Sequence, residues 1–190
     1  MLLTIFKSNE KIDFEKISFD SILNLEENHY RVTMSDELGK EVEGIIITRP
    51  RSSILAWKTY SIKVGKYLNE KLQRKLDIPI KFDQYNFDDQ LFRIWMEMSS
   101  QLIGCSFDYY NNELREVTME GSNLKNSQIF NDEFRQGRIT KIIFTLKDEN
   151  ILITARREGR LSITPDPNIH NLASILDILL KNGTRMVASI

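Results

Sequence analysis

Apolar and polar residues alternate in several short stretches near the N-terminus, which predicts β-strands. Alternation over residues 29–34, the turn-forming residues 35–40 and an apolar run over 42–48 together predict a hairpin, in which Gly39 supplies the positive φ of the turn. Three successive isoleucines in the second arm indicate burial on both faces and hence a central strand, which Arg49-Pro50 then ends.

The rest of the N-terminal part gives a weaker pattern. Residues 2–6 are apolar and predict a further short strand. Residues 8–28 follow neither the strand period nor the helix period, although paired alternations within them favour short extended pieces.

The C-terminal third carries the clearest pattern. Residues 138–147, 151–155 and 160–164 each have strand character, and residues 148–150 and 156–159 have turn composition, so they predict a three-stranded meander. A helix is predicted to follow over residues 167–182, with Asp166 as its cap, Pro167 at its first position and Gly183 at its end. Its broad apolar face requires a sheet or another helix to pack against.

The middle of the chain predicts two more helices. In the first, over residues 53–76, apolar side chains recur at steps of three and four and form one stripe, with Ser52 or Ser53 as the cap. Gly65 weakens this helix by about 1 kcal/mol. An alternative for the same segment is a strand over residues 53–58 followed by a shorter helix from Tyr60. The stripe consists of Ile54, Trp57, Tyr60, Val64, Leu68, Leu72 and Leu76.

The second helix of the middle part is predicted over residues 88–103. Asn86 or Asp88 is its N-terminal cap, and Gly104 stands where a C-terminal cap belongs. Two short strands, 105–110 and 113–119, are predicted beyond it, joined at Asn111-Asn112; residues 120–137 are predicted as a loop with one or two helical turns.

These elements define the fold class. Strands come in hairpins, not singly between helices, so the sequence predicts an α+β fold with a mainly antiparallel sheet and three main helices. A chain of 190 residues is expected to form a single domain, residues 1–190, with an alternative subdivision near residues 82–86.

Composition adds the cellular setting. With Cys105 as its only cysteine the chain forms no internal disulfide, and its first residues lack the plan of a signal peptide. No apolar run approaches the roughly 20 residues of a membrane span. A cytoplasmic protein without membrane contact is therefore expected.

Charge is banded along the chain although the net charge is only −1. Residues 49–81 hold nine basic and two acidic side chains, whereas residues 8–48 and 82–137 each hold four basic and ten acidic ones. Residues 138–190 are again basic, with eight basic and five acidic side chains. Basic bands of this kind suit an acidic partner.

The usual catalytic patterns are absent from the sequence. Two histidines, His29 and His170, and Cys105 cannot supply the four ligands of a structural zinc site. There is no phosphate-binding glycine loop and no nucleophile elbow, and Asp13, Glu15 and Lys16 lack the spacing of a nuclease site. A non-enzymatic protein without a cofactor or a metal site is therefore favoured.

The candidate binding residues are the cations of the two basic bands. The leading hypothesis is an intracellular accessory subunit of a multiprotein complex that docks a protein partner through a basic helix face. The alternative is a nucleic-acid-binding accessory protein that uses residues 49–81 and the tip of the 156–160 hairpin, with interleaved aromatic side chains for base stacking. The residues in question are Arg49, Arg51, Lys63, Lys66, Arg74, Arg156, Arg157 and Arg160.

Overall fold

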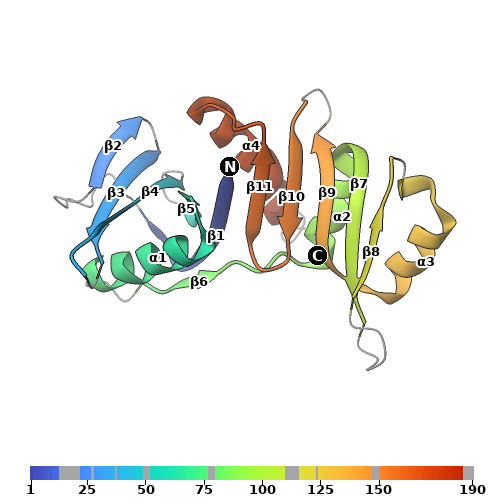
Figure 1. Cartoon of the computed structure of the whole chain (residues 1–190), viewed down its shortest axis with the longest axis horizontal. Helices are drawn as coiled ribbons and strands as arrows, with labels where there is room; N and C mark the ends of the chain where they lie inside the picture. The colour runs from blue at the N-terminus through green and yellow to red at the C-terminus, as the bar shows by residue number, and fades with distance from the viewer. Residues whose placement is uncertain are drawn as a thin grey trace. The chain divides into compact units, whose positions relative to one another are not determined.

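Over the residues that it describes, the computed structural model is an α+β structure built from antiparallel strands and four α-helices, which confirms the predicted fold class (Figure 1). The chain divides into two compact units, unit 1 (Met1–Tyr85) and unit 2 (Asn86–Ile190). The structure describes residues 1–12, 22–26, 28–36, 38–48, 52–76, 80–109, 116–122, 124–146 and 150–185.

Unit 1 is a sheet with one helix against it. Every strand pair is antiparallel, in the order β2-β3-β4-β5-β1, and β6 pairs with the other side of β1. The elements are β1 (Leu2–Ile12), β2 (Ile22–Glu26), β3 (His29–Ser35), β4 (Glu41–Thr48), β5 (Ser52–Thr59), α1 (Ile62–Leu76) and β6 (Phe82–Gln84).

Two glycines allow α1 to lie close to this sheet. A Cβ atom on Gly44 of β4 would come 2.6 Å from Leu68 Cδ1, and one on Gly65 of α1 would come 3.2 Å from Thr4 Oγ1. Gly65 was expected only to weaken the helix, but its missing side chain makes this close approach possible. Leu68 and Leu72 of the helix are fully buried against the sheet as a result.

Unit 2 is a second antiparallel sheet, in the order β11-β10-β9-β7-β8. The helices α2 and α4 lie behind β9, β10 and β11 in Figure 1, and α3 lies at the β8 end. The elements are α2 (Asp89–Met98), β7 (Ser99–Asp108), β8 (Val117–Glu120), a short 3-10 helix (Leu124–Asn126), α3 (Gln128–Gln136), β9 (Arg138–Leu146), β10 (Leu152–Arg156), β11 (Arg160–Thr164) and α4 (Ile169–Arg185).

The core of unit 2 forms around Trp95 of α2. Its ring packs edge-on against Phe87 and Phe92 and stacks on Phe144 of β9. Its indole N–H donates to the Leu179 carbonyl oxygen at 2.7 Å, which joins α2 to α4. One face of the sheet is therefore closed by α2 and α4.

The predicted hairpin and meander are confirmed, with β3 and β4 paired near the N-terminus and β9, β10 and β11 in sequence near the C-terminus. Gly39 and Gly159 have φ values of 76° and 69° in their turns, as turn geometry requires. The expected end of a strand at Arg49-Pro50 and the turn at Asn111-Asn112 lie outside the described residues.

The helix predicted over residues 53–76 is wrong in its first part. Residues 52–59 form β5, and the helix begins at Ile62 with Ser61 as its cap, whose Oγ accepts from the Val64 N–H at 3.3 Å. The alternative of a strand followed by a shorter helix is thus the observed arrangement. The strand prevails because β5 pairs with β4 on one side and β1 on the other.

The helix predicted over residues 88–103 is too long. Asp88 is its cap, as expected, because its Oδ1 accepts from the Leu91 N–H at 2.7 Å. The helix ends at Met98, however, and Ser99 begins β7. Gly104 lies inside that strand, where a Cβ would come 3.0 Å from the Ile143 side chain, so it serves close packing and not a helix cap.

Two smaller predictions also need correction. Residues 128–136 form a full helix, α3, where only one or two turns were expected. The last helix is capped by Asn168, whose Oδ1 accepts from the Asn171 N–H at 2.8 Å, and not by Asp166. Its bounds, Ile169–Arg185, also pass Gly183, so that glycine does not end it.

Candidate interaction surfaces

The basic side chains predicted on a helix face are exposed on α1. Lys63, Lys66 and Arg74 are all exposed, and their spacing of three and eight residues places them on one side of the helix. The opposite side carries the buried Leu68 and Leu72. We call Lys63, Lys66 and Arg74 the α1 surface.

These cations are not explained by helix stability alone. Within the described part of the chain, none of the three forms an ion pair, and the first turn of α1 holds no acidic residue. The helix dipole favours a cation in the last turn, where Arg74 lies, but disfavours cations near the N-terminus. Lys63, in the first turn, therefore opposes the dipole slightly, and both Lys63 and Lys66 are available to an acidic group outside the chain.

The aromatic residues of this segment are not a stacking platform. Trp57 is fully buried on β5, and its indole N–H donates to Asn69 Oδ1 at 3.3 Å. The Tyr67 hydroxyl donates to the Ser35 carbonyl oxygen at 3.0 Å, and the Lys71 ammonium lies over its ring. Tyr60 alone of the three is open, with 79% of its surface exposed.

Arg49 and Arg51, the two cations predicted at the start of this helix, lie outside the described residues. They precede β5 in the sequence, because the helix begins only at Ile62. Any role for them in binding stays a prediction.

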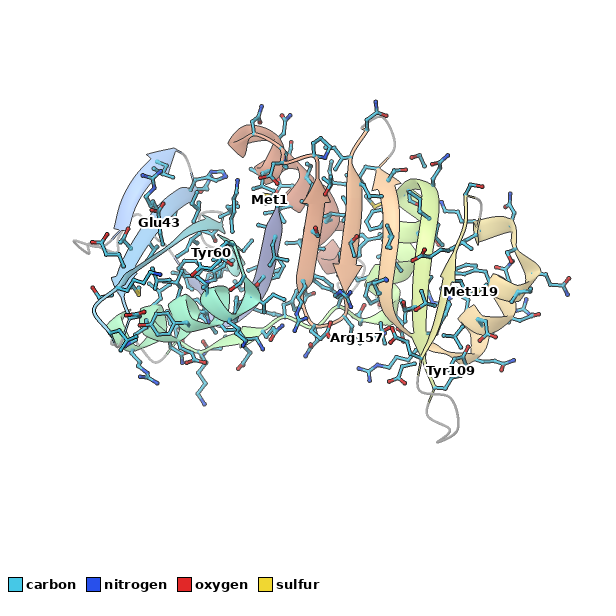
Figure 2. The ribbon with its side chains drawn as sticks, viewed as in Figure 1. Met1, Glu43, Tyr60, Tyr109, Met119 and Arg157 are labelled. Carbon is cyan, nitrogen blue, oxygen red and sulfur yellow. The ribbon has the colours of Figure 1, made fainter. Side chains whose placement is uncertain are left out.

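The hairpin of β10 and β11 separates its three arginines. Arg157 turns toward the helices: its guanidinium pairs with Asp89 of α2, donates to the Ile139 carbonyl oxygen and lies over the Phe92 ring (Figure 2). Only 14% of its side chain is exposed. Arg157 therefore has a structural role in unit 2, which leaves it little capacity to bind a partner.

The other two arginines face the opposite side of the sheet. Arg156 of β10 lies directly opposite Arg160 of β11 and, on its other side, directly opposite Lys141 of β9. The neighbouring residues Ala155, Leu161 and Ile142 are buried on the helix side, which fixes the three cations on the open side. We call Arg156, Arg160 and Lys141 the cationic row.

Lys141 was missed as a candidate residue. The sequence predicted both strands, and the polar composition of residues 148–150 indicated the turn between them. The sequence did not predict the pairing register between these strands, and a shift of one residue would move Lys141 to the buried face.

The remaining candidate groups have structural positions. Cys105 is fully buried in β7, and burial raises the pKa of its thiol to about 12 although Lys141 pulls it down. Its thiolate is thus negligible near neutral pH. His29 is buried within β3, between β2 and β4, and the His170 side chain lies outside the described residues.

Two further features of the described residues concern metal binding and the membrane. No three His, Cys, Asp or Glu side chains gather there in a way that could hold a metal ion. None of the helices in the described ranges combines the length and apolar character that crossing a membrane requires.

Comparison with known proteins gives no family assignment. No family model matches the sequence, and no characterised protein shows significant similarity to it. The exposed surfaces described above are therefore the features that point to a function.

Proposed function

We propose that this protein is a non-enzymatic cytoplasmic subunit of a multiprotein complex, and that it docks an acidic surface of a protein partner on the α1 surface. The observation that supports this most is the presence of Lys63 and Lys66 in the first turns of α1, exposed and without an ion pair in the described structure. Charges that the fold does not use are well suited to set the register and the association rate of a complex.

Packing around α1 supports a rigid docking element. Its inner side is held by Leu68, Leu72 and the close approach at Gly65, and Asn69 ties it to Trp57 on β5 and to the Phe82 carbonyl on β6. A helix fixed in this way presents its outer cations with little loss of conformational entropy on binding.

The test is affinity purification of the full chain from cells that express it, comparing wild type with the Lys63→Glu/Lys66→Glu double variant. We expect a stoichiometric protein partner with wild type and at least a tenfold weaker affinity with the variant, because four units of charge change at the contact. Lys11→Glu/Lys40→Glu is the matched control, since both of those lysines are exposed in unit 1 and the charge change is equal.

Three results would decide against this function. One is a wild-type chain that purifies alone as a monomer; another is equal loss of the partner in the double variant and in the control. The third is loss of the partner after nuclease treatment, which would favour the alternative of a nucleic-acid-binding protein. Circular dichroism of both variants confirms that neither change unfolds α1.

A further inference from the structure

The cationic row places three positive charges side by side across three strands. Arg160, Arg156 and Lys141 occupy directly opposed positions on β11, β10 and β9, and opposed residues in antiparallel strands have Cα atoms about 4.5–5.5 Å apart. Like charges in opposed positions repel each other and destabilise the sheet. The row is thus a feature that the fold maintains against a local cost.

Among the described residues, no ion pair joins these three cations to a carboxylate. The strand residues that share the open face on β9, β10 and β11 include no carboxylate. Glu158, in the turn between the two arginines, is engaged in a contact of its own. The Arg160 Nε is shielded from solvent and finds no hydrogen-bond acceptor among the described residues. An external anion would supply the missing negative charge to the solvent-facing parts of the row.

Hydroxyl groups surround the row. Ser106, opposite Lys141 on β7, is buried, but its Oγ lies 2.9 Å from Oγ1 of the exposed Thr118 on β8. Thr154 and Ser162 oppose each other two residues along β10 and β11, on the same face. Arginine, lysine and hydroxyl side chains together are the donor set that binds phosphate oxygens.

The extent of the row favours one compact anion over a polyanion. Arg160, Arg156 and Lys141 span about 10 Å, as the strand spacing sets it, and the one other cation on the described β9, β10 and β11 is Arg138 at the start of β9. A nucleic acid needs a longer track of charge. The described strands carry no aromatic side chain on this face for base stacking. A sheet face is also too flat to enclose a small molecule.

We infer that the cationic row binds a phosphorylated serine or threonine side chain of a protein partner. A phosphoserine carries nearly two negative charges and three acceptor oxygens, and clusters of arginine recognise it from an open surface. This inference rests on the proposed function as an interaction subunit, but it concerns unit 2 and residues that the α1 surface does not include.

The experiment is a ¹H–¹⁵N NMR titration of the full chain with nine-residue glycine–alanine peptides that differ only at the central residue. That residue is phosphoserine, serine or glutamate. We expect the phosphoserine peptide to shift amide signals of β9, β10 and β11, with at least tenfold weaker binding in Arg156→Thr. Arg138→Thr is the matched control, because Arg138 is exposed like Arg156 and lies on β9 outside the row. This variant should bind the phosphoserine peptide within twofold of wild type.

Thermal unfolding without peptide gives a second readout. Arg156→Thr relieves the like-charge opposition, so it should unfold at the wild-type temperature or above, and it should gain less than wild type from the phosphoserine peptide. A purely structural arginine would instead lower the unfolding temperature when it is removed.

Each contrary result is distinct. Equal binding of the glutamate and phosphoserine peptides, or equal binding by Arg156→Thr and wild type, overturns the inference. Tighter binding of a short oligonucleotide through Arg156 overturns it in favour of nucleic acid. The Lys63→Glu/Lys66→Glu variant should bind the phosphoserine peptide normally, so failure of the α1 surface and failure of the cationic row remain separable.

Discussion

The two units each bury one tryptophan, but they satisfy its indole N–H in different ways. In unit 1, Trp57 lies on a strand and donates to the side chain of Asn69 on α1. In unit 2, Trp95 lies on a helix and donates to the backbone carbonyl of Leu179 on α4. Both rings are fully buried. The first contact depends on one particular side chain, whereas the second requires only that a helix pass at the right distance.

This difference shows where each unit is sensitive to sequence. Asn69 also donates from Nδ2 to the Phe82 carbonyl oxygen at 3.4 Å, so a single amide joins β5, α1 and β6. In unit 2 the corresponding joint is surrounded by three aromatic rings, those of Phe87, Phe92 and Phe144. Unit 1 therefore depends on a polar relay, and unit 2 depends on the volume of its aromatic cluster.

The largest effect is expected from Trp95→Ala. Removing the ring leaves a cavity among the other three aromatics, which costs about 3–5 kcal/mol in free energy of unfolding. Trp95→Phe should cost much less, because it keeps an aromatic ring in the cluster. The Leu179 carbonyl oxygen loses the indole N–H, but as a helix carbonyl it still accepts a hydrogen bond from within α4. Urea denaturation followed by circular dichroism measures both. Equal losses in the two variants would show that the hydrogen bond, and not the ring volume, dominates unit 2.

The next largest effect is expected in unit 1 from Asn69→Leu. The change leaves the Trp57 indole N–H and the Phe82 carbonyl without this partner, at about 1–3 kcal/mol for each buried group. A double-mutant cycle with Trp57→Phe isolates the Trp57–Asn69 contact. We expect a coupling energy of about 1 kcal/mol. If the two single effects simply add, Trp57 and Asn69 are not coupled and this hydrogen bond does not stabilise unit 1.

The same contrast explains which elements the sequence could predict. The meander of unit 2 was predictable because each strand alternates and each turn has the residues that turns need, such as Gly159. In unit 1 the segment around Trp57 fits both the helix period and the strand period. Pairing with β1 and β4 decides in favour of the strand, and that information lies far away in the sequence.

The candidate surfaces divide in a similar way. Exposure of Lys63 and Lys66 followed from helix periodicity alone, since the apolar stripe fixed the opposite side. Strand alternation predicts that Arg157 faces away from Arg156 and Arg160, but it does not predict which residues each of them contacts. The partner of Arg157, Asp89, and the neighbour of Arg156, Lys141, come from distant segments. Local patterns therefore predict which way a side chain faces but not what it meets there.

A third, smaller effect is expected from Gly44→Ala. The added Cβ would come 2.6 Å from Leu68 Cδ1 and 3.1 Å from a Trp57 ring carbon, so the Leu68 side chain or α1 itself must move. Overpacking of this kind costs about 1–3 kcal/mol in free energy of unfolding. Gly121→Ala in unit 2 is the control, because its nearest neighbour would lie at 3.4 Å and the position is exposed. A neutral Gly44→Ala variant would mean that the packing of α1 is looser than the contacts of unit 1 indicate.

The smallest effect on the free energy of unfolding is expected when one ion pair is removed from each unit. Arg157–Asp89 joins a hairpin to a helix in unit 2, with 14% and 48% of the two side chains exposed, whereas Arg31–Glu43 lies across β3 and β4 in unit 1 with 46% and 56% exposed. Exposed pairs contribute at most about 1 kcal/mol, and salt screens them. The shielded guanidinium of Arg157 should make its pair the stronger of the two.

We therefore expect Asp89→Asn to lower the free energy of unfolding by about 1 kcal/mol and Glu43→Gln to change it by less than about 0.5 kcal/mol. High salt should abolish the effect of Glu43→Gln and leave part of that of Asp89→Asn, because Arg157 retains a partly buried charge whose solvent screening is weak. Urea denaturation at 0.1 M and 1 M sodium chloride measures this. Identical salt dependence in the two variants would show that Arg157 is solvated well enough to lose its carboxylate freely. The stacking of the guanidinium on Phe92 and the hydrogen bond from the Phe87 N–H to the Arg157 carbonyl oxygen would then hold the hairpin against α2 and the segment before it.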